Sequence, residues 1–341
     1  MPSPNKAIIA AAGARKTQMV VDGALSDPDR HVLVTTYTND NLRRIARRLV
    51  SGDGVIPTNI EVMPWMTLLL REGANPYQGA VFGEPGLIQG VDFDRGTPLY
   101  ATRGSRRYYL DGARNVYGDV LSDLACRANE DSGGEVIRRL EAIYDHIYID
   151  EVQDLVGWDL DFLDLLFGSR IGVTVVGDPR QHILFTNRRS KNKQYRGSEI
   201  AEWIAERTAV CEVETRADSY RCNQHLCDFA SGLFPQMEAM QSVENILTGH
   251  DGIFEITEGE VADYIERYRP LVLRHNKKSR TLGHAAINIG LAKGSTWDRV
   301  LIFPTKPMRE YLVHRDPTRL KAPERLYVAV TRARYSAAFV V

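Results

Sequence analysis

Apolar runs alternate with segments of helical periodicity along the first part of the chain. The runs expected to form strands cover residues 7–12, 31–36, 60–64, 146–150, 172–176 and 209–214, and helices are expected between several of them. This alternation favours a parallel sheet, because parallel neighbours need a crossover connection. The pattern therefore predicts an α/β domain.

A second series of apolar runs predicts a smaller α/β unit. Its expected strands cover residues 253–256, 271–273, 285–289, 300–303 and 337–341. The stretch from about 66 to 142 interrupts the first series and is predicted to be an insertion, in which Tyr108 to Arg114 form a hairpin around an Asp-Gly turn. The predicted domains are residues 1–207, which include this insertion, and residues 208–341.

Composition limits the class of protein only modestly. The 341 residues are 43% hydrophobic and 26% charged, as in an ordinary soluble globular protein. The net charge is −1, so contact with a polyanion must come from local basic patches. The four cysteines lack the spacing of a metal site or of a disulfide framework, and no apolar run suits a signal peptide or a membrane span. We expect a reduced, cytoplasmic protein with no membrane partner.

Two adjacent carboxylates, Asp150 and Glu151, follow the apolar run Ile147-Tyr148-Ile149. In open parallel sheets, ligands bind beyond the carboxyl ends of the strands. At that position Asp150 would hold Mg²⁺, and Glu151 would polarise an attacking water molecule. The alternative interpretation is a buried strand followed by an acidic turn.

A candidate phosphate-binding loop lies between the first expected strand and the first expected helix. Its sequence is Gly13-Ala14-Arg15-Lys16-Thr17. In such a loop, backbone N–H groups bind phosphate, the lysine reaches the outer phosphates and the threonine ligates Mg²⁺. Two positions depart from the pattern G-x-x-x-x-G-K-[ST]: Ala10 stands at the first glycine and Arg15 at the second. A plain helix N-terminus is the alternative interpretation.

Further motifs follow in an order typical of one family. They are the strings at residues 36–39, 177–181, 219–223, 292–300 and 327–334. Together with the two motifs above, they resemble the superfamily 1 helicases of the UvrD/Rep/PcrA type, from about residue 7 to the last residue. The resemblance implies two RecA-like parallel-sheet P-loop domains in tandem, with a small insertion in the first. It also implies ATP and Mg²⁺ as cofactors.

The resemblance assigns roles to individual residues. Gln181 is similar to the family's γ-phosphate sensor, and Arg221 and Arg332 match two arginine fingers, a task that suits the planar, permanently charged guanidinium. Gly294 matches a nucleotide-binding position. The expected contacts to a nucleic-acid strand are a base-stacking Tyr37 with its neighbours and two weaker aromatic candidates; the set is Tyr37, Thr38, Asn39, Phe185 and Trp65.

The implied function is an ATP-dependent single-stranded DNA translocase or helicase, 3′→5′ by resemblance, that hydrolyses ATP between two RecA-like lobes. The interval between Arg221 and Lys293 is too short for the large second-domain insertion of bigger family members, so a minimal motor is expected. One alternative is an RNA-directed motor. Another is a weakly catalytic, nucleotide-gated subunit of a nuclease or anti-phage complex, which Arg15 and the lack of an adenine-reading segment in Met1–Asn5 motivate.

Overall fold

A computed structural model describes residues 5–50, 54–183, 191–244 and 246–341. Its contacts divide the chain into two compact units that are each discontinuous in sequence. Unit 1 comprises Met1–Ile8, Thr17–Gly177 and Phe185–Glu214, and unit 2 comprises Ile9–Lys16, Asp178–Leu184 and Thr215–Val341. Most of the phosphate loop therefore makes its contacts in unit 2, which sequence periodicity could not indicate.

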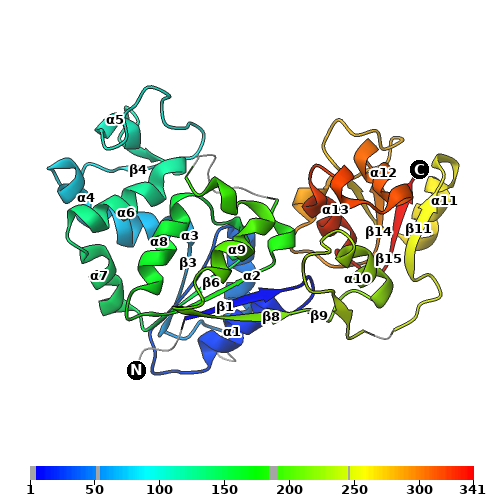
Figure 1. The fold of residues 1–341 in the computed structure, drawn as a ribbon, viewed down its shortest axis with the longest axis horizontal. Helices are drawn as coiled ribbons and strands as arrows, with labels where there is room; N and C mark the ends of the chain where they lie inside the picture. The colour runs from blue at the N-terminus through cyan, green and yellow to red at the C-terminus, as the bar shows by residue number, and fades with distance from the viewer. Residues whose placement is uncertain (1–4, 51–53, 184–190, 245) are drawn as a thin grey trace. The chain divides into compact units, whose positions relative to one another are not determined.

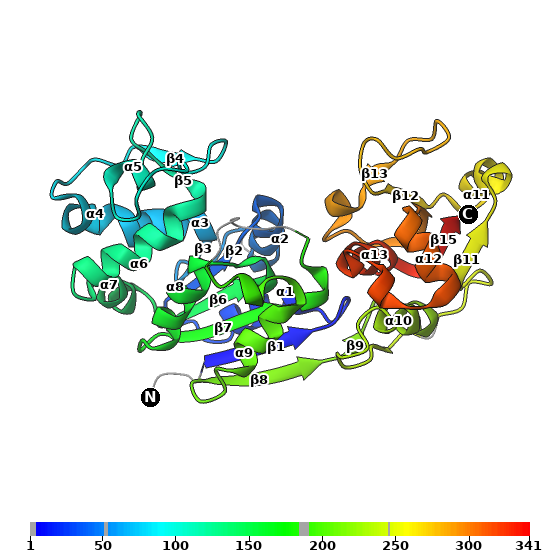
Figure 2. The same ribbon diagram turned by 45° about the horizontal axis from the view of Figure 1, so that its top comes forward.

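The sheet that organises unit 1 has six strands in the order β3-β2-β6-β7-β1-β8 (Figure 2). Their bounds are β1 Asn5–Ala10, β2 Val32–Thr36, β3 Ile60–Pro64, β6 His146–Asp150, β7 Gly172–Gly177 and β8 Cys211–Arg216. The pairs β2·β3, β2·β6 and β6·β7 are parallel. β7 is buried along its whole length, as expected for a Val-rich central strand that is covered on both faces.

The helices that connect these strands follow each strand in turn. They are α1 Lys16–Leu25, α2 Asn39–Leu49, α8 Trp158–Phe167 and α9 Ile200–Ala205. Short 3₁₀ turns at Val152–Asp154, Pro179–Gln181, Lys193–Tyr195 and Gly197–Glu199 complete the connections. The register pairs Thr36 with Asp150 and Asp150 with Val176, so the functional motifs begin at one carboxyl edge of the sheet.

The predicted insertion is a helical segment beside β3, seen at one end of unit 1 in both views (Figure 1). Its elements are α3 Trp65–Leu68, a π-helix at Leu69–Ala74, α4 Asn75–Phe82, β4 Gly90–Asp92, α5 Arg106–Tyr109, β5 Asn115–Tyr117, a 3₁₀ turn at Gly118–Val120, α6 Leu121–Asp131 and α7 Glu135–Ile143.

The hairpin predicted over Tyr108 to Arg114 is wrong. Tyr108 belongs to α5, β5 pairs with β4 in parallel, and only an isolated antiparallel bridge joins Leu110 to Val116. The Asp111 side chain explains the difference, because it accepts the backbone N–H groups of Ala113 and Asn115 at 2.8 Å each. The Asp-Gly pair therefore forms a side-chain-capped turn after a helix rather than a turn between two long strands.

Unit 2 contains a five-stranded sheet in the order β11-β15-β14-β12-β13, in which every neighbouring pair is parallel. The strands are β11 Gly252–Ile256, β12 Leu271–Arg274, β13 Ile287–Asn288, β14 Trp297–Phe303 and β15 Ala333–Val340; β9 Asp218–Ser219 and β10 Gln241–Ser242 form a separate pair. The helices are α10 Gln224–Ser231, α11 Val261–Tyr268, α12 Lys306–His314 and α13 Pro323–Val330, with 3₁₀ turns at Glu258–Glu260, Ile289–Ala292 and Pro317–Arg319.

Alternation along β14 and β15 shows that both faces of this sheet are buried. Val300 and Ile302 belong to one core cluster with Phe339, whereas Leu301 belongs to a second cluster with Val340. Successive strand residues point to opposite faces, so two cores require helices on both sides. The observed sheets confirm the predicted fold class of two RecA-like parallel-sheet domains in tandem. Of the expected strands, only that at 285–289 is much shorter than predicted.

Two further observations concern the helices and the thiols. Over the described ranges, no helix combines the length and the hydropathy needed to span a bilayer. The cysteine thiols at Cys126, Cys211, Cys222 and Cys227 are all free, as the sequence spacing indicates.

Candidate functional site

The N-terminal end of α1 approaches the carboxyl end of β6 in unit 1. The Thr17 hydroxyl donates a hydrogen bond of 3.1 Å to Oδ2 of Asp150. Asp150 is the last residue of β6 and only 2% exposed, and its Oδ1 accepts the backbone N–H of Glu151 at 3.0 Å. A hydroxyl and a carboxylate thus come from two elements that are distant in sequence.

These oxygens fit a Mg²⁺ site. Mg²⁺ prefers hard oxygen ligands and is usually held by one or two protein side chains together with substrate phosphates and water. Thr17 and Asp150 are the residues that would hold it, and the ion would neutralise charge on the phosphates. Among the described residues, no cluster of three or more His, Cys, Asp or Glu side chains is placed to hold a metal ion.

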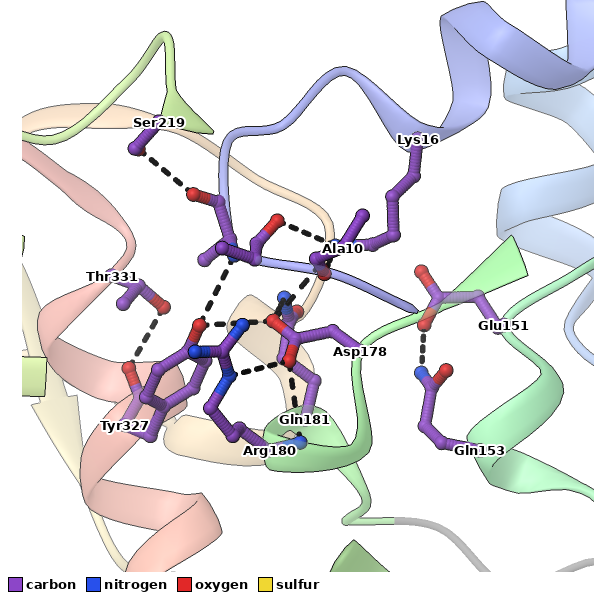
Figure 3. Close-up of polar contacts among 12 residues, drawn as sticks. Ala10, Lys16, Glu151, Gln153, Asp178, Arg180, Gln181, Ser219, Tyr327 and Thr331 are labelled. Atoms are coloured by element: carbon purple, nitrogen blue, oxygen red, sulfur yellow. Dashed lines mark hydrogen bonds and ion pairs between the residues drawn. The ribbon is translucent and has the colours of Figure 1, made fainter. Parts of the chain in front are cut away.

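Glu151 has an unusual backbone conformation. Its φ of 62° lies in the left-handed region, which non-glycine residues adopt rarely and at a cost of roughly 1–2 kcal/mol. The Gln153 side-chain amide donates a hydrogen bond to the Glu151 carboxylate (Figure 3). Gly177 makes this turn possible, since a Cβ there would lie 2.4 Å from Oε1 of Gln153. The strained turn holds the Glu151 carboxylate, half-buried, next to Asp150.

The phosphate loop makes a series of backbone contacts within unit 2. Gly13 has a φ of +85°, and its carbonyl accepts the Tyr220 N–H at 3.1 Å. The Ser219 hydroxyl donates to the Ala12 carbonyl at 2.8 Å. Ala14 is buried, at 3% exposure. The loop is therefore built against the segment that precedes α10.

Arg15 replaces the glycine of the phosphate-loop pattern in a left-handed conformation, with a φ of 59°. Its guanidinium lies 3.8 Å from the centroid of the Tyr220 ring. An exposed cation–π contact of this kind contributes about 0.5–1 kcal/mol, which offsets part of the cost of the backbone conformation. The contact explains how the loop accommodates a bulky residue at this position.

Lys16 and Asp178 lie together inside unit 2. The Lys16 ammonium donates to the carbonyls of Ala10 at 3.1 Å and Ala11 at 2.9 Å, and it lies 3.9 Å from Oδ2 of Asp178. Asp178 is fully buried and also accepts Nε of Arg180 at 2.8 Å. Burial alone would raise the pKa of Asp178, but the Arg180 and Lys16 cations hold the pKa below its usual value. The carboxylate is therefore charged at neutral pH.

Three further predicted residues lie around the same carboxylate or close to it. The Gln181 amide donates to Oδ2 of Asp178 at 2.8 Å (Figure 3). The Gln181 carbonyl oxygen accepts Nη2 of Arg332 at 3.2 Å. Arg332 is 1% exposed. Arg221 donates to the Thr331 carbonyl at 3.0 Å, next to Arg332 in the chain. Arg332 thus contacts Gln181 directly, and Arg221 contacts the residue that precedes Arg332.

Gly294 lies in the turn between the 3₁₀ turn at Ile289–Ala292 and β14, with a φ of +86°. The carbonyl of the next residue, Ser295, accepts Nη1 of Arg332 at 3.3 Å, and Arg332 in turn contacts Gln181. The nucleotide-binding role of Gly294 stays a prediction.

The residues predicted to contact a strand occupy different environments. Tyr37 is half-buried after β2, and burial followed by the Asp159 and Asp154 carboxylates raises its pKa. Thr38 caps α2 by accepting the N–H of Asn41, and Asn39 is exposed as the first residue of that helix. Tyr37 and Asn39 therefore retain accessible surface next to the edge of the sheet.

Trp65 is a correction to the predicted strand contacts. The side chain is fully buried, its indole N–H donates to Oδ1 of Asp159 at 2.8 Å, and its ring packs edge-to-face on Phe162. These contacts make Trp65 a core residue of unit 1, so it is not available to contact a strand. Phe185 lies outside the described residues.

Four residues that hydrogen-bond to the predicted site residues or to the phosphate loop received no role from the sequence: Asp178, Ser219, Gln153 and Tyr327. Asp178, Ser219 and Tyr327 belong to motif strings in which only Gln181, Arg221 and Arg332 received roles. The position of Asp178 directly after a buried strand is the same signal that singled out Asp150, and it could have been used. Tyr327 opens the motif string at 327–334, but its residue type gave no signal, because a tyrosine in an apolar helix is typical of a core residue.

One family model matches part of the chain. Residues 113–199 match the UvrD/REP helicase N-terminal domain, a segment that includes Asp150, Glu151 and Gln181. No curated protein matches the chain. The match is confined to this segment, and over these residues the chain is similar to the N-terminal domain of UvrD/REP helicases.

Solved structures with a similar arrangement are distant in sequence. The PRRSV helicase is 16% identical with a TM-score of 0.49, over 98% of this chain and 52% of that chain. Arterivirus nonstructural protein 10 (helicase) is 16% identical with a TM-score of 0.48, over 98% of this chain and 59% of that chain. The complex of arterivirus nonstructural protein 10 with DNA is 16% identical with a TM-score of 0.49, over 98% of this chain and 61% of that chain. The chain thus spans between half and two thirds of the length of these proteins, and likenesses this distant bear no functional argument.

Proposed function

We propose that this chain is an ATP-dependent motor of the UvrD type that moves along single-stranded DNA, with 3′→5′ polarity. The observation that carries the proposal is the hydrogen bond between Thr17 and Asp150. It joins the start of the helix after the phosphate loop to the acid that ends β6, and these are the two elements that hold Mg²⁺-nucleotide in P-loop enzymes.

The proposed roles follow from position and chemistry. Lys16, the residue before Thr17, binds the outer phosphates, and Glu151 accepts the proton of the attacking water. Gln181 reports the state of the γ-phosphate, and Arg221 and Arg332 stabilise charge that develops during transfer. The Asp178-centred contacts support this assignment because they connect Gln181 with both Lys16 and Arg332.

For the strand, the proposed contacts are Tyr37, Thr38 and Asn39. An accessible aromatic ring can stack on any base, and each such contact contributes about 1–3 kcal/mol without sequence preference. Tyr37 lies directly after Thr36, which pairs in register with Asp150. A strand held there would lie close to the carboxylate end of β6, so strand binding and nucleotide turnover are proposed to be coupled.

The test is steady-state ATP hydrolysis by the whole chain, with and without single-stranded DNA. We expect stimulation by the strand that disappears in Lys16→Ala and survives in Lys277→Ala, which removes an exposed lysine of unit 2. Greater stimulation by RNA homopolymers would favour an RNA-directed motor. No hydrolysis under any condition would refute the proposed activity and favour a nucleotide-gated subunit that acts with a nuclease.

A further inference from the structure

Tyr327 of α13 is fully buried, and its hydroxyl lies between the phosphate loop and Asp178 (Figure 3). The Ala12 N–H donates to this hydroxyl at 3.1 Å, and the hydroxyl oxygen lies 2.9 Å from Oδ2 of Asp178. The Ala12 N–H can only donate, so the hydroxyl proton is left for an acceptor, either Oδ2 of Asp178 or the Met240 sulfur at 3.3 Å. The buried carboxylate is the stronger acceptor of the two, because a thioether sulfur accepts only weakly. The Tyr327 hydroxyl therefore accepts a hydrogen bond from the phosphate loop and donates one to Asp178.

The Tyr327 hydroxyl keeps its proton at neutral pH. Burial raises the pKa of Tyr327 well above its usual value, while the Arg180 cation opposes this effect. The ring is held by contacts that do not involve the hydroxyl, because it packs edge-to-face on Phe234 with centroids 5.7 Å apart. Removal of the oxygen alone should consequently leave the ring in place.

Asp178 depends on its donors more than an exposed acid would. A buried charge that loses one hydrogen-bond donor is not compensated by water, so the remaining groups must shift to satisfy it. Those groups are the side chains of Arg180, Gln181 and Lys16. Two of them, Gln181 and Lys16, carry proposed roles in nucleotide turnover.

We infer that Tyr327 is a positioning residue that acts through Asp178 to hold Gln181 and Lys16 in place against the phosphate loop. The kinetic consequence of this inference rests on the proposed ATP hydrolysis. The hydrogen bonds of Tyr327 to Ala12 and Asp178 do not depend on that activity. Tyr327 touches neither nucleotide nor strand in this scheme, and its effect passes from Ala12 and Asp178 to the amide of Gln181.

The kinetic test compares Tyr327→Phe with Tyr311→Phe. Tyr311 is a second buried tyrosine of unit 2, 2% exposed, whose ring packs edge-to-face on Phe229, whereas Tyr327 packs on Phe234. We expect Tyr327→Phe to lower kcat about tenfold, as for loss of a hydrogen bond to a buried charge, with less than about a twofold change in KM for ATP. Tyr311→Phe should leave both values near those of the unmodified chain.

A double variant separates positioning from a general loss of stability. If Tyr327 acts through Gln181, Tyr327→Phe should have little further effect on kcat in a Gln181→Ala background. Multiplicative effects of the two substitutions would overturn the inference, because they would show independent action. Equal kcat values for Tyr327→Phe and the unmodified chain would also overturn it.

Hydrogen exchange tests the link without reference to activity. Tyr327→Phe should speed exchange of the Ala12 amide, whereas Tyr311→Phe should not. Unchanged protection of Ala12 would refute the link even in an active enzyme. Conversely, a chain that shows the exchange effect but hydrolyses no ATP would refute the proposed function and not the structural link, so the two failures are distinguishable.

Discussion

Gly13→Ala is the substitution for which the structure defines a cost most directly. A Cβ at Gly13 would lie 2.4 Å from the Ser219 hydroxyl and 2.9 Å from Cβ of Arg221, and the φ of +85° disfavours any side chain. The Ser219 hydroxyl must then move, which breaks its 2.8 Å bond to the Ala12 carbonyl. One methyl group thus acts on the loop conformation and on the segment that carries Arg221.

The magnitude is the sum of two terms. The left-handed backbone costs about 1–2 kcal/mol for alanine relative to glycine, and the lost hydrogen bond costs about 1 kcal/mol. The expected decrease in the free energy of unfolding of unit 2 is therefore about 2–3 kcal/mol. Gly283→Ala is the matched control in the same unit: its φ is +83°, but nothing lies within 4 Å of the added Cβ, so only the backbone term of about 1–2 kcal/mol applies.

The assay is urea unfolding of both variants, combined with measurement of MgATP affinity. We expect Gly13→Ala to unfold at lower urea than Gly283→Ala and to bind nucleotide at least about tenfold more weakly, since the loop that receives phosphate is displaced. Gly283→Ala should bind nucleotide normally. Equal unfolding midpoints and equal affinities for the two variants would refute the packing argument and show that the loop readily opens away from Ser219.

Three other outcomes test separate parts of the molecule. Glu151→Gln should retain MgATP binding and lose turnover by at least about a hundredfold, as expected for a general base; near-normal turnover would remove Glu151 from that role. Tyr37→Ala should reduce strand-stimulated turnover more than basal turnover, while Tyr37→Phe keeps the ring and the stimulation; equal loss of both rates in Tyr37→Ala would make Tyr37 a packing residue. Burial lowers the pKa of His146 from 6.5 to about 4, so the folded state resists protonation and stability should fall by up to about 3 kcal/mol as the pH drops from 6.5 towards 4. His146→Gln should flatten that dependence in pH-dependent urea unfolding, and an unchanged slope would exclude His146 as its source.

The sequence predicted the strands of both sheets because their buried faces demand continuous apolar residues. β6 has the apolar run Ile147-Tyr148-Ile149 at its centre and β7 has three valines, and Asp150 marks the end of β6 in the sequence as it does in the structure. The two carboxylates and the Lys-Thr pair could be assigned for the same reason, since strand, turn and helix succeed one another locally.

Contacts between distant segments could not be predicted in the same way. The indole of Trp65 is buried by Asp159 and Phe162, which no local pattern indicates. Likewise, the stack of Arg15 on Tyr220 and the bonds of Tyr327 join segments that only the tertiary fold brings together. The Asp111 turn was misjudged because an Asp-Gly pair favours a hairpin but is equally compatible with a side-chain cap.

The left-handed backbone at Glu151 has an evolutionary consequence. Glycine or asparagine would relieve the strain at this position by about 1 kcal/mol, while either would remove the acid. Selection for stability and selection for turnover thus favour different amino acids at a single codon. A lineage that no longer needed hydrolysis would gain from losing the glutamate, and its retention in descendants of this chain would signal that the turn is still under functional selection.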